Sequence, residues 1–79
     1  MRRKSEQGFA KAQFKLGTMY VKGQGVTQDD VSAHMWFNIA GSNGHKNAIK
    51  NRGIIEKIMT QQQIEKAQEM ARNWKPKTK

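Results

Sequence analysis

The amino-acid sequence predicts an all-α protein of about four helices, arranged as two αα-hairpins. Apolar residues recur at spacings of three and four along four separate stretches, which is the period of an α-helix with one buried face. Gly23 and Gly25 separate the first two stretches, and glycine accepts the positive φ of a tight reversal without a Cβ clash. Two helices that meet across such a short turn form an αα-hairpin.

The first helix is expected over residues 9–22. One of its faces carries four residues: Phe9, Gln13, Leu16 and Tyr20. Three lysines lie largely off that face: Lys11, Lys15 and Lys22. Gly17 stands inside the helix, where glycine costs ~1 kcal/mol relative to alanine. We therefore expect a neighbouring helix to approach closely at Gly17.

The second helix is expected to begin after Thr27 and to end near Asn43 and Gly44, either of which suits the left-handed position after a helix. Thr27 and Asp30 have the spacing of a capping box, and acidic residues suit the positive end of the helix dipole. Asp29 and Asp30 could instead form an acid–base pair. Adjacent helical residues point about 100° apart, however, so helix capping is the favoured interpretation.

The largest apolar side chains of the second helix are Trp36 and Phe37. They recur with Ala33 and Ala40 at helical spacing, which predicts contacts in the core. The alternative is an exposed aromatic surface that stacks bases or ligands. The core interpretation is favoured because alanines share the same stripe.

The third helix is expected over residues 46–58, with four apolar positions: Ala48, Ile49, Ile55 and Ile58. Gly53 interrupts it. The fourth helix begins with another capping box, formed by Thr60 and Gln63. Its apolar residues recur at helical spacing: Ile64, Ala67, Met70, Ala71 and Trp74. Pro76 then ends the helix.

The first hairpin carries a dense pattern at fixed spacing: Ala10, Ala12, Phe14, Leu16, Gly17, Tyr20, Gly23, Gly25, Val26, Asp29, Ala33, Trp36, Phe37, Ala40 and Gly44. This pattern resembles the Sel1-like repeat, a tetratricopeptide-like αα-hairpin that stacks into a right-handed superhelix, or solenoid. Two positions depart from it, because Thr27 stands where proline is frequent and Gly41 where alanine is usual. The resemblance implies a non-catalytic scaffold for protein–protein interaction.

The resemblance also implies a division of the chain into four parts. They are the tail of a preceding repeat with a basic arm (residues 1–8), the repeat hairpin (9–44), a C-terminal capping hairpin (45–75) and a basic tail (76–79). Trp74 would seal the exposed end of the capping hairpin. The start of the chain inside a repeat suggests that a further repeat precedes it.

Length and composition allow one small basic domain. A chain of 79 residues buries only ~60% of its unfolded surface, and without cysteine no disulfide or thiolate metal site adds stability. The formal net charge of +9 favours polyanions or acidic protein surfaces as partners. No apolar run follows the basic N-terminus and no 18-residue apolar stretch occurs, so we expect neither signal peptide nor membrane span, and a cytoplasmic location.

The sequence contains no recognisable catalytic constellation. It has no cysteine nucleophile, no histidine–carboxylate pair at helical spacing and no phosphate-binding loop. His34 and His45 have no Cys, Asp or Glu at metal-ligand spacing, so both are interpreted as surface residues. We expect no enzymatic activity, no cofactor and no metal.

The leading hypothesis is a protein-interaction module whose uncapped N-terminal face binds a partner protein or a second copy, because solenoid repeats bury their faces against neighbours. The predicted contact residues are Phe9, Gln13, Phe14 and Met19. The alternative is a basic nucleic-acid-binding protein, with these candidate phosphate contacts: Arg2, Arg3, Lys50, Arg52 and Lys57. It is less favoured because the basic residues are scattered and lack interleaved exposed aromatics.

Overall fold

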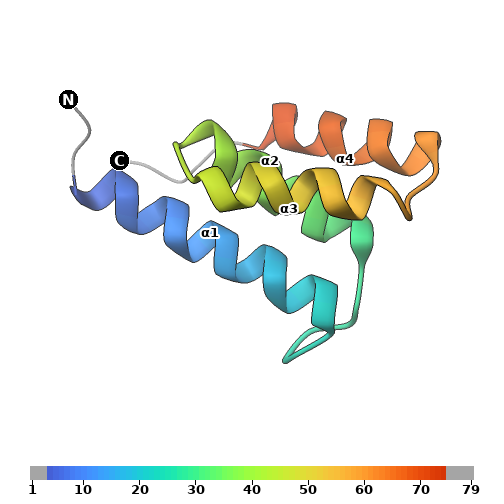
Figure 1. Ribbon diagram of the computed structural model, residues 1–79, viewed down its shortest axis with the longest axis horizontal. Coiled ribbons are helices and arrows are strands. Elements are labelled where there is room, and N and C mark those ends of the chain that lie inside the picture. The colour runs from blue at the N-terminus through green and yellow to red at the C-terminus, as the bar shows by residue number, and fades with distance from the viewer. Residues whose placement is uncertain (1–3, 75–79) are drawn as a thin grey trace.

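The computed structural model describes residues 4–74 of the chain, with side-chain surroundings for residues 9–74. The described part contains four α-helices and no strand, which confirms the predicted all-α class (Figure 1). The helices are α1 (Lys4–Lys22), α2 (Asp30–Ser42), α3 (Lys46–Glu56) and α4 (Gln61–Asn73). None of these helices is long and apolar enough to cross a membrane.

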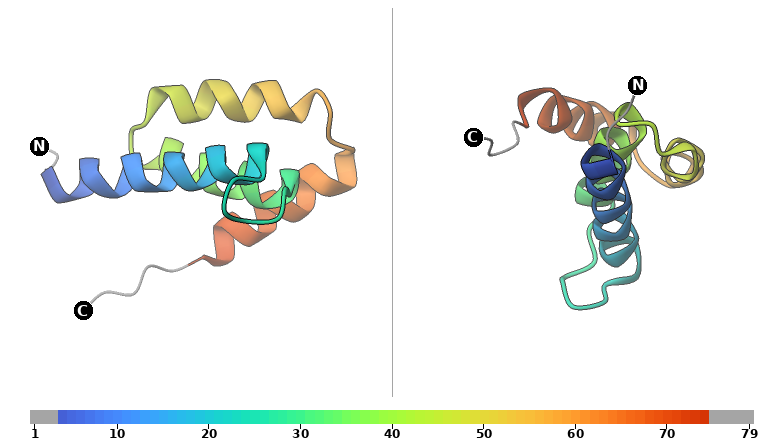
Figure 2. Two further views of the ribbon diagram at one scale, coloured as in Figure 1. Left: turned by 90° about the horizontal axis from the view of Figure 1, so that it is seen from below. Right: turned by 90° about the vertical axis from the view of Figure 1, so that its left-hand side faces the viewer.

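Helix α2 is the centre of the molecule, and the other three helices all pack on it. Figure 2 shows α1, α3 and α4 around three different sides of α2, with α3 and α4 on opposite sides. Consecutive helices run in opposite directions along the long axis (Figure 1). The region expected to form a capping hairpin, residues 45–75, therefore places its two helices on either side of α2.

The core surrounds Phe37, which is 1% exposed. The other buried residues of the core come from α2 itself, from α3, from α4 and from the turn before α4: Ala33, Ala40, Ala48, Ile55, Met59 and Ala67. Gly17 of α1 faces the Phe37 ring so closely that a Cβ on Gly17 would lie 2.6 Å from ring carbons. The prediction of a close helix approach at Gly17 is confirmed. Phe37 is a core residue as predicted, whereas Trp36 is only half-buried.

Gly41 has a similar role at the end of α2. A Cβ on Gly41 would lie 2.6 Å from Cγ1 of Ile49, so α3 approaches α2 over a position without a side chain. Glycine thus allows the closest contacts of α2 on two sides, with α1 and with α3. The left-handed residue predicted after α2 is Gly44, with φ of 97°.

The turn and cap predictions are partly correct. Gly23 and Gly25 have φ of 69° and 76°, as the reversal after α1 requires. The cap of α2 is Asp29, not Thr27: its carboxylate accepts hydrogen bonds from the backbone N–H of Val31 at 3.0 Å and of Ser32 at 3.4 Å. A carboxylate caps more strongly than a neutral hydroxyl because its bonds are charge-assisted.

The cap of α4 is as predicted, and that of α3 was not predicted. Thr60 and Gln63 form the reciprocal capping box, with bonds of 3.1 Å and 2.9 Å. The N-cap of α3 is His45, whose Nδ1 accepts a hydrogen bond from the backbone N–H of Ala48 at 3.2 Å. His45 is half-buried, so it is not the simple surface residue expected.

Candidate functional site

An open groove of about 960 Å³ lies between α1 and α4, on the side of α2 away from α3. Its lining residues are Phe9, Ala12, Gln13, Leu16, Trp36, Asn38, Ile39, Ser42, Asn43, Gln68, Ala71, Arg72 and Trp74. We call this feature the α1/α4 groove. Figure 2 shows how the three helices that line it, α1, α2 and α4, are arranged.

The groove walls follow from the helical repeat of the sequence. On α1 the lining residues Phe9, Ala12, Gln13 and Leu16 are spaced by three, one and three positions, so they share one helical face. On α4 the pair Gln68 and Arg72 lies one turn apart. Most of the lining surface is apolar, and its polar groups are mainly amides.

Two tryptophans join the floor of the groove to its α4 wall. Trp36 of α2 meets Trp74 edge-on, with ring centroids 5.7 Å apart and planes inclined at 72°. This is a favoured aromatic geometry, contributing ~0.5–1.5 kcal/mol beyond area burial. Both rings are half-buried, so each keeps surface available on the groove side.

A hydrogen bond between two amides stiffens the floor beside α1. Asn43 Nδ2 donates to Gln13 Oε1 at 2.9 Å, and Gln13 is only 6% exposed. The bond fixes α1 against the end of α2. Phe9 lies one turn before Gln13 and is 64% exposed, which makes it a large apolar side chain open to solvent at the groove.

The four predicted contact residues do not all lie on the same surface. Phe9 and Gln13 both line the α1/α4 groove. Phe14 packs inward: its ring lies 5.7 Å from Phe37 and stacks on His45 at 4.3 Å between centroids. Met19 is half-buried beside the turn at Gly25. Their contact with a partner stays a prediction, and the geometry places only Phe9 and Gln13 on one open surface.

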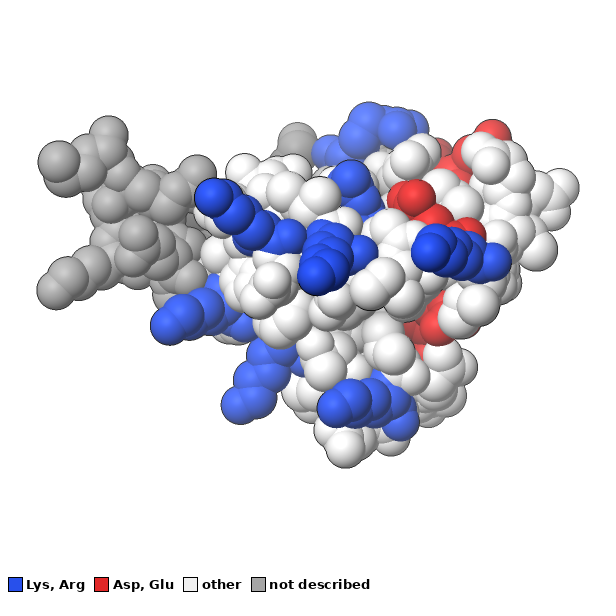
Figure 3. Space-filling model, in the orientation of Figure 1, with Lys and Arg blue, Asp and Glu red and all other residues white. Residues whose placement is uncertain are grey.

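The described candidate phosphate contacts, Lys50, Arg52 and Lys57, do not line the groove. Lys50 and Lys57 are exposed, on α3 and just beyond its end. On the face shown in Figure 3, lysine and arginine side chains are spread rather than gathered. Arg52 is half-buried: its Nη1 donates to Asn38 Oδ1 at 3.4 Å, and its Nε lies 3.9 Å from Glu56 Oε2. Arg2 and Arg3 fall outside the described residues.

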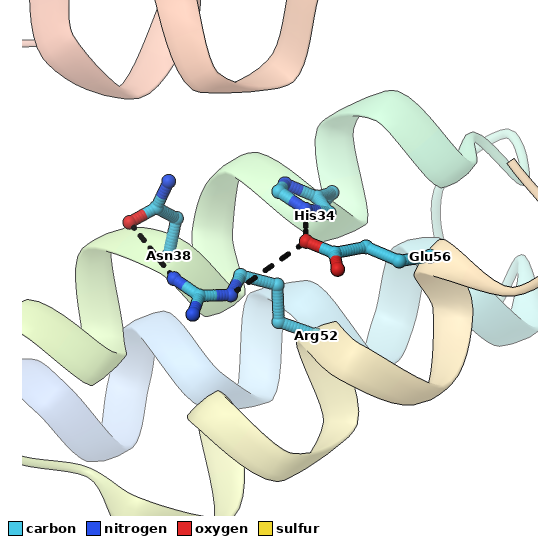
Figure 4. A network of polar contacts seen from close by, with 4 residues as sticks. All are labelled: His34, Asn38, Arg52 and Glu56. Atoms are coloured by element: carbon cyan, nitrogen blue, oxygen red, sulfur yellow. Dashed lines mark hydrogen bonds and ion pairs between the residues drawn. The ribbon is translucent and has the colours of Figure 1, made fainter. Parts of the chain in front are cut away.

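A histidine–carboxylate pair lies on the opposite side of α2, where α3 packs (Figure 4). His34 is wholly buried, which corrects the prediction of a surface residue, and its Nε2 lies 2.7 Å from Glu56 Oε2. The sequence did not reveal the pair because its members are 22 positions apart, on different helices. Nε2–H is the donor in this bond, since the carboxylate can only accept.

The His34–Glu56 pair resembles the orienting half of a catalytic triad, yet its surroundings indicate a structural role. A general base needs its second ring nitrogen within hydrogen-bond reach of a substrate. Nδ1 of His34 is buried without a hydrogen-bond partner, and the whole side chain is inaccessible. The pair therefore joins α2 to α3, and Arg52 extends the network to Asn38. Among the described residues, no three His, Cys, Asp or Glu side chains are grouped as metal ligands.

Comparison with known families finds a match to the first hairpin. Residues 10–45, which include most of α1 and all of α2, match the family described as the Sel1 repeat. No curated protein matches the chain. Sel1 repeats typically mediate protein–protein interactions and are generally non-catalytic.

Proposed function

We propose that this chain is a non-catalytic protein-interaction module whose binding surface is the α1/α4 groove with Phe9, because residues 10–45 match the Sel1 repeat family. The observation that carries the proposal is Phe9, an aromatic side chain 64% exposed beside a groove of about 960 Å³. Soluble proteins rarely leave an apolar groove of this size without use.

The energetics favour binding at this surface over exposure to water. Complete burial of a phenylalanine side chain is worth ~1.5–3 kcal/mol, and most of the Phe9 side chain is still in contact with solvent. Solenoid repeats ordinarily bury such faces against a neighbouring repeat. A protein ligand in the groove would gain the same contacts.

A second copy of the chain is one such ligand, joined through the same face of both subunits in an isologous contact. The formal net charge of +9 on each copy opposes this contact. Salt screens that repulsion, since the Debye length falls from ~30 Å at 0.01 M to ~3 Å at 1 M ionic strength. We therefore expect self-association to be weak at low salt and to increase as salt is added.

The test is size-exclusion chromatography with light scattering at about 0.01 M and about 1 M salt. We expect the native chain to move from its monomer mass of 9.1 kDa towards twice that value at high salt. Phe9→Asp should stay monomeric at both salt concentrations. The matched control is Ile58→Asp, since Ile58 is 72% exposed but does not line the groove; it should behave like the native chain.

Two results would overturn this binding surface. In the first, Phe9→Asp associates as the native chain does. In the second, Ile58→Asp abolishes association, which would move the interface to the end of α3. A native chain that stays monomeric and binds no protein probe through Phe9 would remove the proposal altogether.

The second candidate function is nucleic-acid binding, supported by Lys50 and Lys57, which are exposed on α3 and just beyond its end. Its affinity would fall steeply with salt, because phosphate neutralisation releases counterions. Arg52 is already engaged with Asn38 and Glu56, and α3 carries no aromatic residue to stack on bases. Absorbance at 260 nm that co-elutes at low salt and is lost at high salt would favour this alternative.

A further inference from the structure

We propose that the α1/α4 groove takes an acidic amphipathic helix of another protein, with the apolar face of that helix against the two tryptophans. This inference rests on the proposed function and goes further, because it names the chemistry of the partner. It depends on the size of the groove, on its aromatic anchors and on the charge around it.

The size of the groove fits a short length of helix. An α-helix with side chains is about 10–12 Å across and rises 5.4 Å per turn, so 960 Å³ corresponds to roughly two turns. The groove already has helices as both walls and as its floor. An amphipathic helix laid between two helices, with anchors at positions i, i+3 or i+4 and i+7, is a recurrent mode of protein recognition.

The lining residues provide anchors and space for such a helix. Trp36 and Trp74 form one large apolar surface, and Phe9 forms another on the opposite wall. Tryptophan is enriched among residues that dominate binding energy at interfaces. Ala12 and Ala71 on the two walls are small, so they leave the intervening space open to the side chains of a ligand.

Charge distinguishes an acidic ligand from a second copy of this chain. Among the described residues that line the groove, Arg72 is the one charged side chain and none is a carboxylate.

Arginine is suited to carboxylates because its planar guanidinium donates two parallel hydrogen bonds. An acidic helix would be attracted by Arg72 and by the net charge of +9, whereas a second copy would be repelled by both. A second copy should therefore bind the α1/α4 groove more weakly than an acidic helix does. The proposed ligand is a helix with an acidic polar face and an apolar face.

The two tryptophans of the chain give a direct readout, because Trp36 and Trp74 are the only ones in the sequence and both line the groove. The probes are two synthetic peptides of about 14 residues with leucine at every third or fourth position. One has glutamate at its polar positions and the other has lysine. We expect the glutamate peptide to change tryptophan emission saturably, and the lysine peptide to leave it unchanged.

Charge reversal on α4 provides the matched pair of variants. Arg72→Glu should weaken binding of the glutamate peptide by about tenfold, as expected for loss of a charge-assisted contact and introduction of a repulsive charge. Lys66→Glu makes the same change in net charge on an exposed residue of the same helix outside the groove, so it should weaken binding less than about threefold. Circular dichroism of both variants checks that the helices persist.

The possible outcomes separate this inference from the proposed function. Equal binding of both peptides, or equal losses in the two variants, overturns the acidic ligand while leaving a protein-binding groove. Phe9-dependent self-association without binding of either peptide overturns the acidic helix and retains the module. A single-stranded oligothymidine that changes tryptophan emission at lower concentration than the glutamate peptide would identify a nucleic acid as the occupant and overturn both.

Discussion

The two sides of helix α2 differ in how completely they are filled. On the α3 side, Gly41 brings the helices together, and the buried His34 bonds to Glu56 at 2.7 Å. On the α4 side, the Trp36–Trp74 contact holds the two helices together but leaves a groove of about 960 Å³ towards α1. The filled side supports the fold, and the open side leaves apolar surface that we propose as the binding site.

The largest expected effect comes from removing the residue on which both sides depend. Phe37 is 1% exposed and is contacted from α1 at Gly17. Phe37→Ala should lower the free energy of unfolding by about 3–5 kcal/mol. Small domains have only about 5–15 kcal/mol in total, so the variant should be largely unfolded in mild urea. Urea titration followed by circular dichroism measures the change, and a midpoint close to that of the native chain would contradict the assigned core.

A smaller loss of stability is expected when only the His34–Glu56 hydrogen bond between α2 and α3 is removed. Glu56→Ala removes the acceptor of His34 Nε2–H, which is buried, and should cost about 1–3 kcal/mol of stability. Glu69→Ala is the matched control on exposed α4 surface and should cost under about 0.5 kcal/mol. Chemical denaturation compares the two variants.

The folded Glu56→Ala variant tests whether the two sides of α2 are independent. Its tryptophan emission should match that of the native chain, and it should still bind the glutamate peptide, because Glu56 does not line the groove. If Glu56→Ala abolished peptide binding without unfolding the chain, the two sides of α2 would not be independent.

The smallest expected effect concerns the start of α2. Asp29→Ala removes the side-chain acceptor for the N–H groups of Val31 and Ser32, and should cost about 1 kcal/mol. Thr27→Ala should change stability by less than about 0.5 kcal/mol, since Thr27 is exposed and is not the cap. Thermal unfolding of the two variants ranks them, and the reverse order would return the cap to Thr27.

Features that depend on local sequence could be predicted. Apolar periodicity located all four helices, and the φ of Gly23 and Gly25 follows from the need for a tight turn. The cap of α4 was also predictable, because Thr60 and Gln63 satisfy a local spacing rule. The cap of α2 was not predictable, since the four consecutive residues 27–30 all carry a side-chain oxygen and the sequence does not rank them.

Features that depend on how distant helices pack could not be predicted. The placement of α4 across α2 from α3 creates the α1/α4 groove, and no local pattern specifies it. Trp36 and Trp74 meet across 38 positions of sequence, and His34 meets Glu56 across 22. The helical face of Phe9 predicts a contact residue, but no feature of the sequence predicts that α4 and Trp74 form the opposite wall of the groove. A buried histidine whose only side-chain partner is a distant carboxylate leaves no spacing signal in a sequence.

We propose that the α4 side of α2 binds a partner, whereas the α3 side stabilises the fold. The most direct measurement is a two-dimensional ¹H–¹⁵N NMR titration of the labelled chain with the glutamate peptide. We expect the largest chemical-shift changes at groove residues, including Phe9, Ala71, Arg72 and the two tryptophan indoles. Changes concentrated on α3, around Lys50 and Ile54, would contradict it and assign binding to the opposite face.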